Sequence, residues 1–306
     1  MNKNLSIAGI AALSLATTLP LAATENAPRK PFAEWADLPL PKQFILRLAY
    51  TEGESYHIWD GNQRHNINVN KNGEDYGIDP MQGNILMEYG IAKKWAADLN
   101  LGYGAVGTRS FNAGGNSEST SGLLDTTLGV RYQLLNEADA PSPWLPTLTF
   151  RAGAVFPGSY KKDFPFAPGN HSVAIEPSIL LKKHFAWQGF GAYGDVFYRW
   201  MRSSGDDQYS VALGLFQEIK SWTLNAGWRH QHQLSGYNLN FGGVGAALTY
   251  SPQVREISDS VEAGFSYRLP KWDVKLGFYT RKKFDGSNTD SAFSVGGYVE
   301  VPFGGK

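Results

Sequence analysis

Two histidines and one oxygen-rich loop are the residues of this sequence whose types and spacing could hold a metal ion. His230 and His232 are two positions apart, so both would lie on one face of a strand. Their phase is the outward one, and no third ligand is evident beside them. The run from Asn68 to Gly73, followed by Asp79, has the spacing of a calcium loop but begins on a neutral Asn. We therefore expect no metal, with interfacial histidines at the first place and a hairpin tip at the second.

Nucleotide binding and hydrolysis are the other chemistries that short motifs suggest. G-x-G-x-x-G occurs at 102–107 and at 189–194, but both runs lie inside alternating segments, where glycine lets a strand bend or an aromatic ring lie flat. His171 and Ser172 adjoin, but neighbouring strand residues face opposite ways and cannot form a catalytic pair. We expect no catalytic residue, no cofactor and a protein that is not an enzyme.

Most of the chain consists of stretches in which apolar and polar residues alternate. Between Gly122 and Leu135, for example, Leu128 and Val130 point one way while Asp125 and Arg131 point the other. Such a segment has one apolar and one polar face, and about ten tilted residues cross the hydrocarbon of a bilayer. The pattern predicts an all-β protein, a transmembrane antiparallel β-barrel.

Alternation and turn residues together predict twelve strands, an even number that leaves both termini on the periplasmic side. The predicted strands are 44–51, 84–91, 96–108, 123–134, 147–156, 173–184, 190–201, 209–219, 223–233, 260–269, 274–282 and 293–301. Residues 234–259 are harder to assign, since 241–252 could form a short strand pair in an outer loop or the top of a strand.

The connections alternate between short turns and long loops, which is the asymmetry of outer-membrane barrels. Most connections after odd-numbered strands are long and rich in Gly, Asn, Asp and Ser. The connections on the other side carry a tryptophan each, which predicts a periplasmic aromatic belt. These tryptophans are Trp95, Trp144, Trp187, Trp222 and Trp272.

The two phases of the strands differ in charge. The outward phase carries no charged residue, as contact with lipid requires, and the inward phase carries acidic and basic residues in nearly equal number. Two interpretations stay open: the charges pair and fill a structural barrel, or they line a polar conduit. We favour the conduit, because an anchor needs fewer than twelve strands. The expected pore-lining residues are Asp125, Arg131, Arg151, Glu176, Asp195, Arg199 and Arg229.

Two segments precede the barrel. Residues 1–23 are expected to be a cleaved signal peptide, because Lys3 is followed by an uncharged run that ends on the small residues Ala22 and Ala23. Residues 24–42 are rich in proline, which predicts extended chain. This segment either hangs in the periplasm or enters the lumen, and residues 43–306 form the barrel. Inside the lumen the segment would place a gate, made of Phe32, Trp35 and Leu38.

Composition limits the partners. The chain of 306 residues has no Cys, which excludes disulfides and thiolate metal sites, and its formal net charge of zero gives no reason to expect nucleic acid. We expect a location in the bacterial outer membrane. The expected partners are outer-membrane lipid and lipopolysaccharide, the barrel-assembly machinery and a small-molecule solute.

The stretches GLLDTTLGVRYQLL and PTLTFRAGAVFPGSY resemble a family of outer-membrane proteins grouped under the meta-pathway of phenol degradation. The matching residues are Asp125, Arg131, Tyr132, Pro157 and Gly158. The resemblance implies a barrel distantly similar to hydrocarbon and fatty-acid channels, which admits small hydrophobic or aromatic compounds. The Asn-Pro-Ala motif of the fatty-acid channels is absent, and the terminal aromatic that serves assembly is displaced inward to Phe303.

The function that the sequence favours is an outer-membrane channel for passive uptake of a small solute, hydrophobic or aromatic. Two alternatives from other classes stay open. One is a structural or adhesive barrel that acts through its extracellular loops, and the other is an outer-membrane hydrolase.

Overall fold

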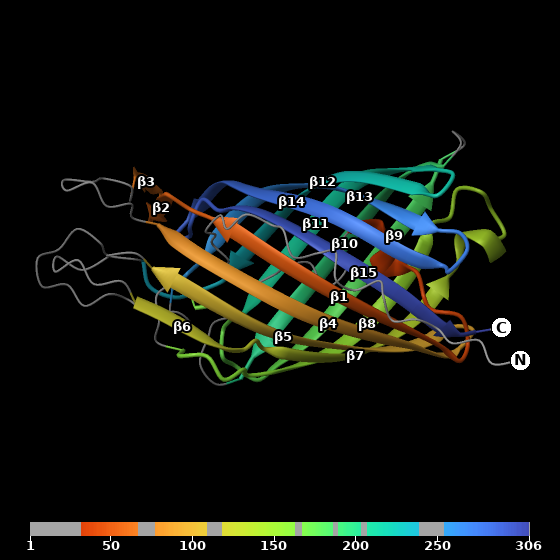
Figure 1. The fold of residues 1–306 in the computed structure, drawn as a ribbon, viewed down its shortest axis with the longest axis horizontal. Coiled ribbons are helices and arrows are strands. Elements are labelled where there is room, and N and C mark those ends of the chain that lie inside the picture. Colours follow the sequence, from red (N-terminus) through yellow and green to blue (C-terminus); the bar gives the residue numbers. More distant parts are fainter. Residues whose placement is uncertain are drawn as a thin grey trace, which may run out of the picture.

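The structure is a computed structural model that describes residues 32–66, 77–108, 118–162, 167–185, 189–202, 207–238 and 254–305. Within these residues, antiparallel strands close into a barrel of 12 strands (Figure 1). The predicted fold class and strand number are confirmed. The predicted signal peptide, the run from Asn68 to Gly73 and residues 241–252 lie outside the described residues.

Each predicted strand has a counterpart in the wall of the barrel. The outer ends of β4 and β14 extend beyond the prediction, because polar residues continue the hydrogen-bonded ladder after the alternation has stopped. The wall strands are β1 (Gln43–Glu54), β4 (Ile78–Ala92), β5 (Trp95–Thr108), β6 (Glu118–Leu123), β7 (Thr126–Leu135), β8 (Thr147–Phe156), β9 (Ala174–His184), β10 (Phe190–Met201), β11 (Gln208–Ile219), β12 (Trp222–Gln233), β13 (Ile257–Leu269), β14 (Val274–Ser287) and β15 (Phe293–Gly304).

One predicted strand is interrupted. The stretch 123–134 was expected to be continuous, but Leu124 and Asp125 separate β6 from β7, and both segments pair with β5. The two segments therefore count as one strand of the wall. The cause is the Asp125 side chain, which is hydrogen-bonded to an outer loop instead of lining an uninterrupted ladder.

The first and last strands close the barrel. β1 pairs with β15 from Gln43 opposite Gly304 to Glu54 opposite Phe293, and β4 pairs with both β1 and β5. The short turns after β4, β11 and β13 lie at the end where β1 begins, which is the right-hand end in Figure 1. Most connections at the other end are longer, so the predicted asymmetry between short turns and long loops is confirmed. By the rule for outer-membrane barrels, the end with the short turns is the periplasmic one.

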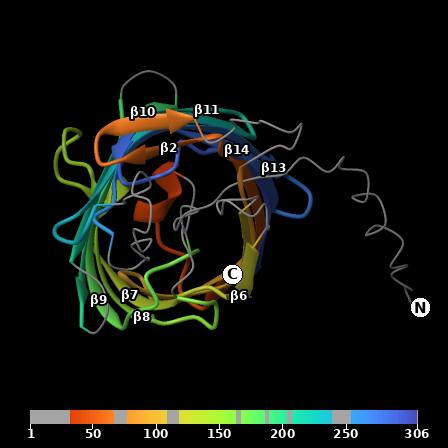
Figure 2. The ribbon, with the colours of Figure 1, turned by 90° about the vertical axis from the view of Figure 1, so that its left-hand side faces the viewer.

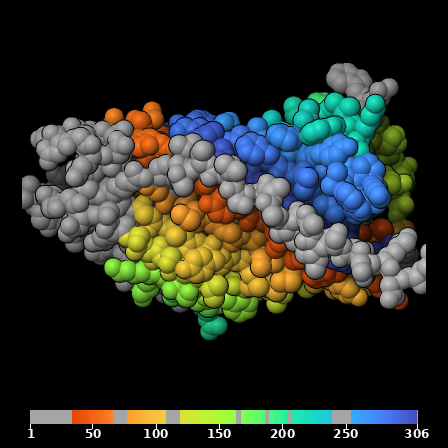
Figure 3. Space-filling view, viewed as in Figure 1, coloured from red at the N-terminus to blue at the C-terminus, as the bar shows by residue number. Residues whose placement is uncertain are grey.

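The outer surface of the wall carries many exposed apolar side chains. Figure 3 shows one side of the barrel in space-filling form, coloured by position in the sequence. Because closure pairs the backbone groups of every wall strand, such a barrel can stand in hydrocarbon, and its location is the bacterial outer membrane. Within the described residues, no helix combines the length and apolar character needed to span a membrane. Exposed apolar residues of the wall include Leu48, Ile85, Leu128, Phe150, Ile179, Leu213, Val261 and Leu276.

Exposed tryptophans mark the periplasmic turns. Trp95, Trp144, Trp222 and Trp272 are each more than two-fifths exposed, as an indole at the lipid and water boundary would be. Trp187 lies outside the described residues.

The extracellular end of the barrel is capped by packed loops. The hairpin of β2 (His57–Asp60) and β3 (Gln63–Asn66) lies against the β14–β15 loop, since Trp59 N donates to Thr289 O at 2.7 Å. A small apolar core fills the space beneath them. Its members are Ile58, Ile78, Val106, Tyr160, Ala167, Val254 and Ala292.

Candidate functional site in the barrel lumen

Buried charges form a continuous row on the inner face of the wall from β4 to β10, which we name the β4–β10 charge row. Asp98 pairs with both Arg131 and Arg151, and Glu176 pairs with both Arg151 and Arg199. Every side chain of the row is at most 3% exposed. The pairs are Arg131 to Glu88 at 3.0 Å, Arg131 to Asp98 at 3.5 Å, Arg151 to Asp98 at 2.7 Å, Arg151 to Glu176 at 3.0 Å and Arg199 to Glu176 at 2.8 Å.

A second group of charges continues around the wall from β10 to β14. Arg229 Nη1 lies 3.1 Å from Asp195 Oδ1, and Arg229 Nε lies 3.2 Å from Glu262 Oε1. Arg281 Nη2 shares the same Glu262 oxygen at 2.6 Å. The charges of this group are thus also paired. Glu262 pairs with Arg229 and Arg281 on the neighbouring strands, and Arg229 reaches Asp195 across β11.

A third group joins the wall to the segment before the barrel. Glu34 lies on the short 3₁₀ helix η1 (Phe32–Ala36), and its carboxylate contacts Arg47 Nη2 and Lys275 Nζ, each at 2.8 Å. Glu300 pairs with the same two cations, with Arg47 at close range and with Lys275 at 3.4 Å. Two acidic and two basic side chains therefore form a closed square, of which one corner belongs to η1.

The lumen side chains also bind the backbone of η1, which lies inside the ring of strands in Figure 2. The last carbonyls of a helix have no partner within it, and here donors from β7 and β8 supply the missing hydrogen bonds. The bonds run from Arg131 Nη1 to Trp35 O at 3.2 Å and to Asp37 O at 3.0 Å, from Gln133 Nε2 to Ala36 O at 3.3 Å, and from Thr149 Oγ1 to Ala36 O at 2.7 Å.

Trp35 is the member of the predicted gate with the clearest contacts. The guanidinium carbons of Arg131 and Arg151 lie 5.4 Å and 5.6 Å from the centre of its ring, within cation–π distance. Leu38 is partly buried where the chain leaves the lumen. The backbone of Phe32 starts η1, and its side chain lies outside the described residues.

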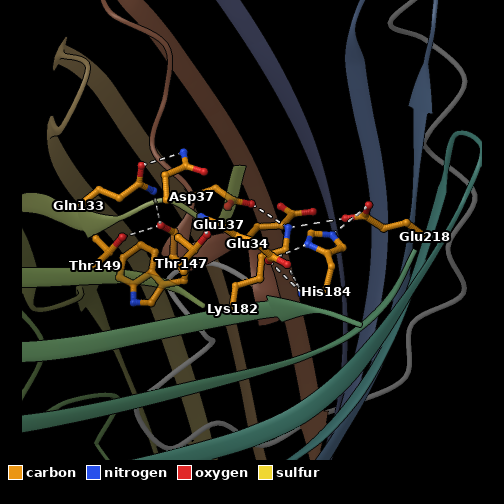
Figure 4. Close-up of polar contacts among 12 residues, drawn as sticks. Glu34, Asp37, Gln133, Glu137, Thr147, Thr149, Lys182, His184 and Glu218 are labelled. Carbon is orange, nitrogen blue, oxygen red and sulfur yellow. Dashed lines mark hydrogen bonds and ion pairs between the residues drawn. The ribbon is translucent and has the colours of Figure 1, made fainter. Parts of the chain in front are cut away.

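A chain of polar contacts joins one arc of the wall to the residues that follow η1 (Figure 4). Lys182 Nζ lies 2.9 Å from Asp37 Oδ2 and 3.6 Å from Glu218 Oε1. His184 lies between two carboxylates, with Nδ1 at 3.2 Å from Glu137 Oε2 and Nε2 at 3.4 Å from Glu218 Oε2. Strands β9 and β11 and the β7–β8 turn are thereby linked to the segment that η1 belongs to.

Glu137 lies in the β7–β8 turn, outside the membrane-spanning part of the wall. Burial raises the pKa of its carboxyl, but hydrogen bonds from the Lys183 ammonium and from the backbone and ring of His184 outweigh burial and hold that pKa below its ordinary value. The carboxylate is therefore stabilised in its charged form. In that form it anchors the β7–β8 turn to Lys183 and His184 of β9.

Asp125 lies apart from the other predicted pore-lining residues and binds the β8–β9 loop. Its carboxylate accepts hydrogen bonds from Gly158 N at 2.8 Å, the Tyr160 hydroxyl at 2.9 Å and Asn170 N at 3.1 Å. A side chain on Gly158 would meet the Leu123 carbonyl at 1.9 Å, so glycine is required at this close approach. Asp125 thus fixes an outer loop against the wall.

Aromatic rings line the lumen beside the second charge group. Phe216 lies against Gly191, Tyr193 against Gly214 and Gly227, and Tyr298 against Gly277. A Cβ at any of these glycines would lie 2.1 to 2.3 Å from an atom of the aromatic side chain, so the rings lie flat over the strands. The sequence predicted that glycines of the G-x-G-x-x-G runs let an aromatic ring lie flat. Gly191 of the second run, which begins in the turn before β10 and continues in that strand, has this role.

Six of the seven predicted pore-lining residues thus lie in the first two charge groups, and Asp125 lies at the outer loop. The sequence reasoning missed Glu34 and Asp37, which join the segment before the barrel to the wall, and the neutral donors Gln133 and Thr149. The signal for the first two was an acidic residue on each side of Trp35, and the signal for the others was their inward phase.

The histidines that the sequence analysis considered form ion-pair and ring contacts with neighbouring side chains. His230 Nδ1 lies 3.2 Å from Asp259, and the His232 ring stacks on Tyr209 with centres 5.3 Å apart. The His171 ring meets Tyr160 edge-on. Within the part of the chain that the structure describes, no group of three or more metal-binding side chains is arranged to hold an ion.

Comparisons with known proteins identify the kind of barrel. The model of a family described as "Putative MetA-pathway of phenol degradation" matches residues 82–305. No curated protein matches the sequence. The structure of the COG4313 outer membrane channel from Pseudomonas putida F1 aligns with a TM-score of 0.67 at 15% identity, over 87% of this chain and 97% of that one. The translocator domain of the autotransporter NalP from Neisseria meningitidis aligns with a TM-score of 0.48 at 12% identity, over 89% and 92%.

Proposed function

Because the chain belongs to the outer-membrane family described as "Putative MetA-pathway of phenol degradation", we propose that it is a channel for passive uptake of a small hydrophobic or aromatic solute. Its structural similarity to an outer membrane channel of Pseudomonas putida F1 supports the barrel that such a channel needs. The solute would cross the lumen between the β4–β10 charge row and the aromatic rings of the opposite wall.

The observation that carries this proposal is the way in which η1 closes the lumen. The segment is held by ion pairs of Glu34 and Asp37 and by hydrogen bonds to its backbone carbonyls, such as that from Thr149. Water can replace such polar contacts at a net cost of about 0.5–1.5 kcal/mol for a typical hydrogen bond and about 1.5–3 kcal/mol for one to a charged group. None of these contacts is part of the ladder, so η1 can leave without unfolding of the wall.

In this proposal Phe32, Trp35 and Leu38 form the gate, and the charged residues of the wall line the passage when the segment moves. The pore-lining charges pair with one another, so their ion pairs persist whether η1 is present or absent. Each arginine of the β4–β10 charge row keeps a carboxylate partner on the barrel wall. The pore-lining groups are Asp125, Arg131, Arg151, Glu176, Asp195, Arg199 and Arg229.

The aromatic rings support the class of solute. Tyr193, Phe216, Tyr279 and Tyr298 form one cluster on the inner face of the wall, and a planar solute can slide past rings that lie flat. The surrounding lipid, lipopolysaccharide and the barrel-assembly machinery are the partners that the proposal includes. It involves no catalytic step.

The experiment is reconstitution of the purified protein into liposomes and planar bilayers. We expect osmotic swelling with an arabinose-sized sugar at a rate above that of protein-free liposomes, and single-channel steps in the bilayer. Absence of both would overturn the channel.

A structural or adhesive barrel is the second candidate, favoured by the packed extracellular cap around Ile58 and Tyr160. Its mark would be binding of a surface or a cell by the intact protein, lost on exchange of the outer loops, with no solute uptake. Turnover of a lipid or ester by the purified protein would favour a hydrolase instead.

A further inference from the structure

A cavity of about 420 Å³ remains at the periplasmic mouth after η1 has entered the lumen. One wall is the chain that leaves the lumen, residues 37–41. The other consists of the β4–β5 turn with Lys93 and Lys94, and the end of β7 with the β7–β8 turn. The cavity reaches inward to Gln133, whose amide binds the η1 backbone, so it continues the path that a solute in the lumen would take. Its volume falls within the range of about 300–1,000 Å³ that is typical of small-molecule pockets.

Most of the lining is apolar although it lies beside water. Leu40 and Leu134 are 56% and 42% exposed, and both residues are part of the lining. Prolines keep the chain wall extended and rigid. The apolar residues of the lining are Leu38, Pro39, Leu40, Pro41, Leu134, Leu135, Ala140 and Pro141.

Within the part of the chain that the structure describes, some charged residues of the lining have an ion-pair partner and one does not. Asp37 is paired with Lys182 at 2.9 Å, and Asp139 is paired with Lys93 at 2.9 Å. Among the described residues, Lys94 has no carboxylate within ion-pair distance, and its ammonium donates only a long hydrogen bond of 3.4 Å to Leu134 O. A cation at the edge of an apolar cavity is thus left for an anion from outside the chain.

We propose that this cavity binds a small amphipathic monocarboxylate, with its ring or alkyl body against the leucines and prolines and its carboxylate at Lys94. It is the periplasmic release site of the channel, an assignment that rests on the proposed function. The ligand would touch residues 37–41, which directly follow η1 in the chain. A solute that arrives from the lumen would therefore bind beside the segment that has to move to let it pass.

Binding can be measured without transport, because the chain contains no Cys. Ala140→Cys places a single thiol in the lining, and Lys271→Cys places one on the β13–β14 turn as the control. Both proteins are held in nanodiscs of zwitterionic lipid and labelled with uncharged N-ethylmaleimide, with increasing benzoate or its uncharged analogue benzyl alcohol. We expect benzoate to slow labelling saturably at position 140 and to leave position 271 unchanged. Benzyl alcohol should require a higher concentration.

The role of the ammonium is tested by Lys94→Gln in the Ala140→Cys protein, with Lys220→Gln as a matched turn lysine outside the cavity. Loss of one partly exposed charged hydrogen bond should raise the half-protecting benzoate concentration roughly three- to tenfold, whereas Lys220→Gln should not change it. Labelling that saturating benzoate does not slow, or protection that Lys94→Gln leaves unchanged, overturns the proposal. Liposome uptake of benzoate is followed in parallel: uptake without protection retains the channel and removes this site, and protection without uptake retains the binding site and removes the channel.

Discussion

Lys275 Nζ lies 2.8 Å from Glu34 Oε1, so a cation of β14 and a carboxylate of η1 meet inside the barrel. The same carboxylate contacts Arg47 at 2.8 Å, and all three side chains are at least four-fifths buried. This contact ties the segment that precedes the first strand to both sides of the seam where the barrel closes.

Glu34→Gln should weaken the hold on the segment while the wall keeps its own pairing, because Glu300 still pairs with both cations. We expect a higher mean conductance and more frequent openings in planar-bilayer recordings, with assembly unchanged. Glu52→Gln, near the outer end of the same strand as Arg47, is the control. Conductance equal to that of the unmodified protein would show that Glu34 does not retain the segment.

Deletion of residues 25–39 should raise conductance without preventing assembly. The deletion removes Glu34, Trp35 and Asp37 but no residue of a wall strand, since β1 begins at Gln43. Assembly is checked by the shift in gel mobility between boiled and unboiled samples, and conductance by planar-bilayer recording. If the deleted protein conducted like the intact one, the segment would not be a gate.

Gly90→Ala should displace the chain at the mouth. A Cβ at this position would lie 2.0 Å from Leu40 O, and Gly90 O accepts a hydrogen bond of 2.6 Å from Lys42 N, so the backbones are too close for a side chain. We expect faster quenching of Trp35 fluorescence by a polar quencher. Gly83→Ala, where the nearest atom is 4.0 Å away, is the matched control in the same strand. The other tryptophans are replaced by phenylalanine to make the signal specific.

Acid should weaken the β7–β8 turn through Glu137. Because its pKa is lower in the folded protein than in the unfolded chain, its stabilising contribution is complete above the unfolded value of about 4.5 and is lost as the pH falls through the folded value. The difference in thermal unfolding temperature between the unmodified protein and Glu137→Gln should therefore be largest near pH 7 and shrink as the pH falls below the unfolded value. A difference that stayed constant with pH would contradict this account.

Arg151→Met should destabilise the barrel more than any change to a surface ion pair. After the substitution Asp98 keeps its pair with Arg131, at 3.5 Å, and Glu176 keeps its pair with Arg199. Three buried carboxylates then share two arginines, and removal of one partner of a buried pair costs about 3–5 kcal/mol. Lys93→Met removes the exposed pair with Asp139 and should cost at most about 1 kcal/mol. Unfolding in urea, followed by tryptophan fluorescence, compares the two. Equal effects would mean that the β4–β10 charge row adds little to stability.

The sequence by itself determined the barrel, its twelve strands, and the inner or outer face of nearly every residue. Alternation with a period of two is a local property, and lipid on one side of the wall excludes charge from one phase, so Leu128 and Arg131 could be assigned without a structure. The break at Leu124 and Asp125 escaped that reasoning, because its cause is a loop more than thirty residues further along the chain.

The tertiary structure alone decided which charges meet and what occupies the mouth. Arg47 faces Glu300 only because closure brings the first and last strands into one register, and Glu34 joins them only because η1 enters the lumen. The sequence left two positions open for residues 24–42, since proline and little periodicity predicted extended chain and no location. The prediction of extended chain was wrong for residues 32–36, which form η1. The location depends on donors such as Arg131 and Thr149, which come from different strands and converge only when the barrel has closed.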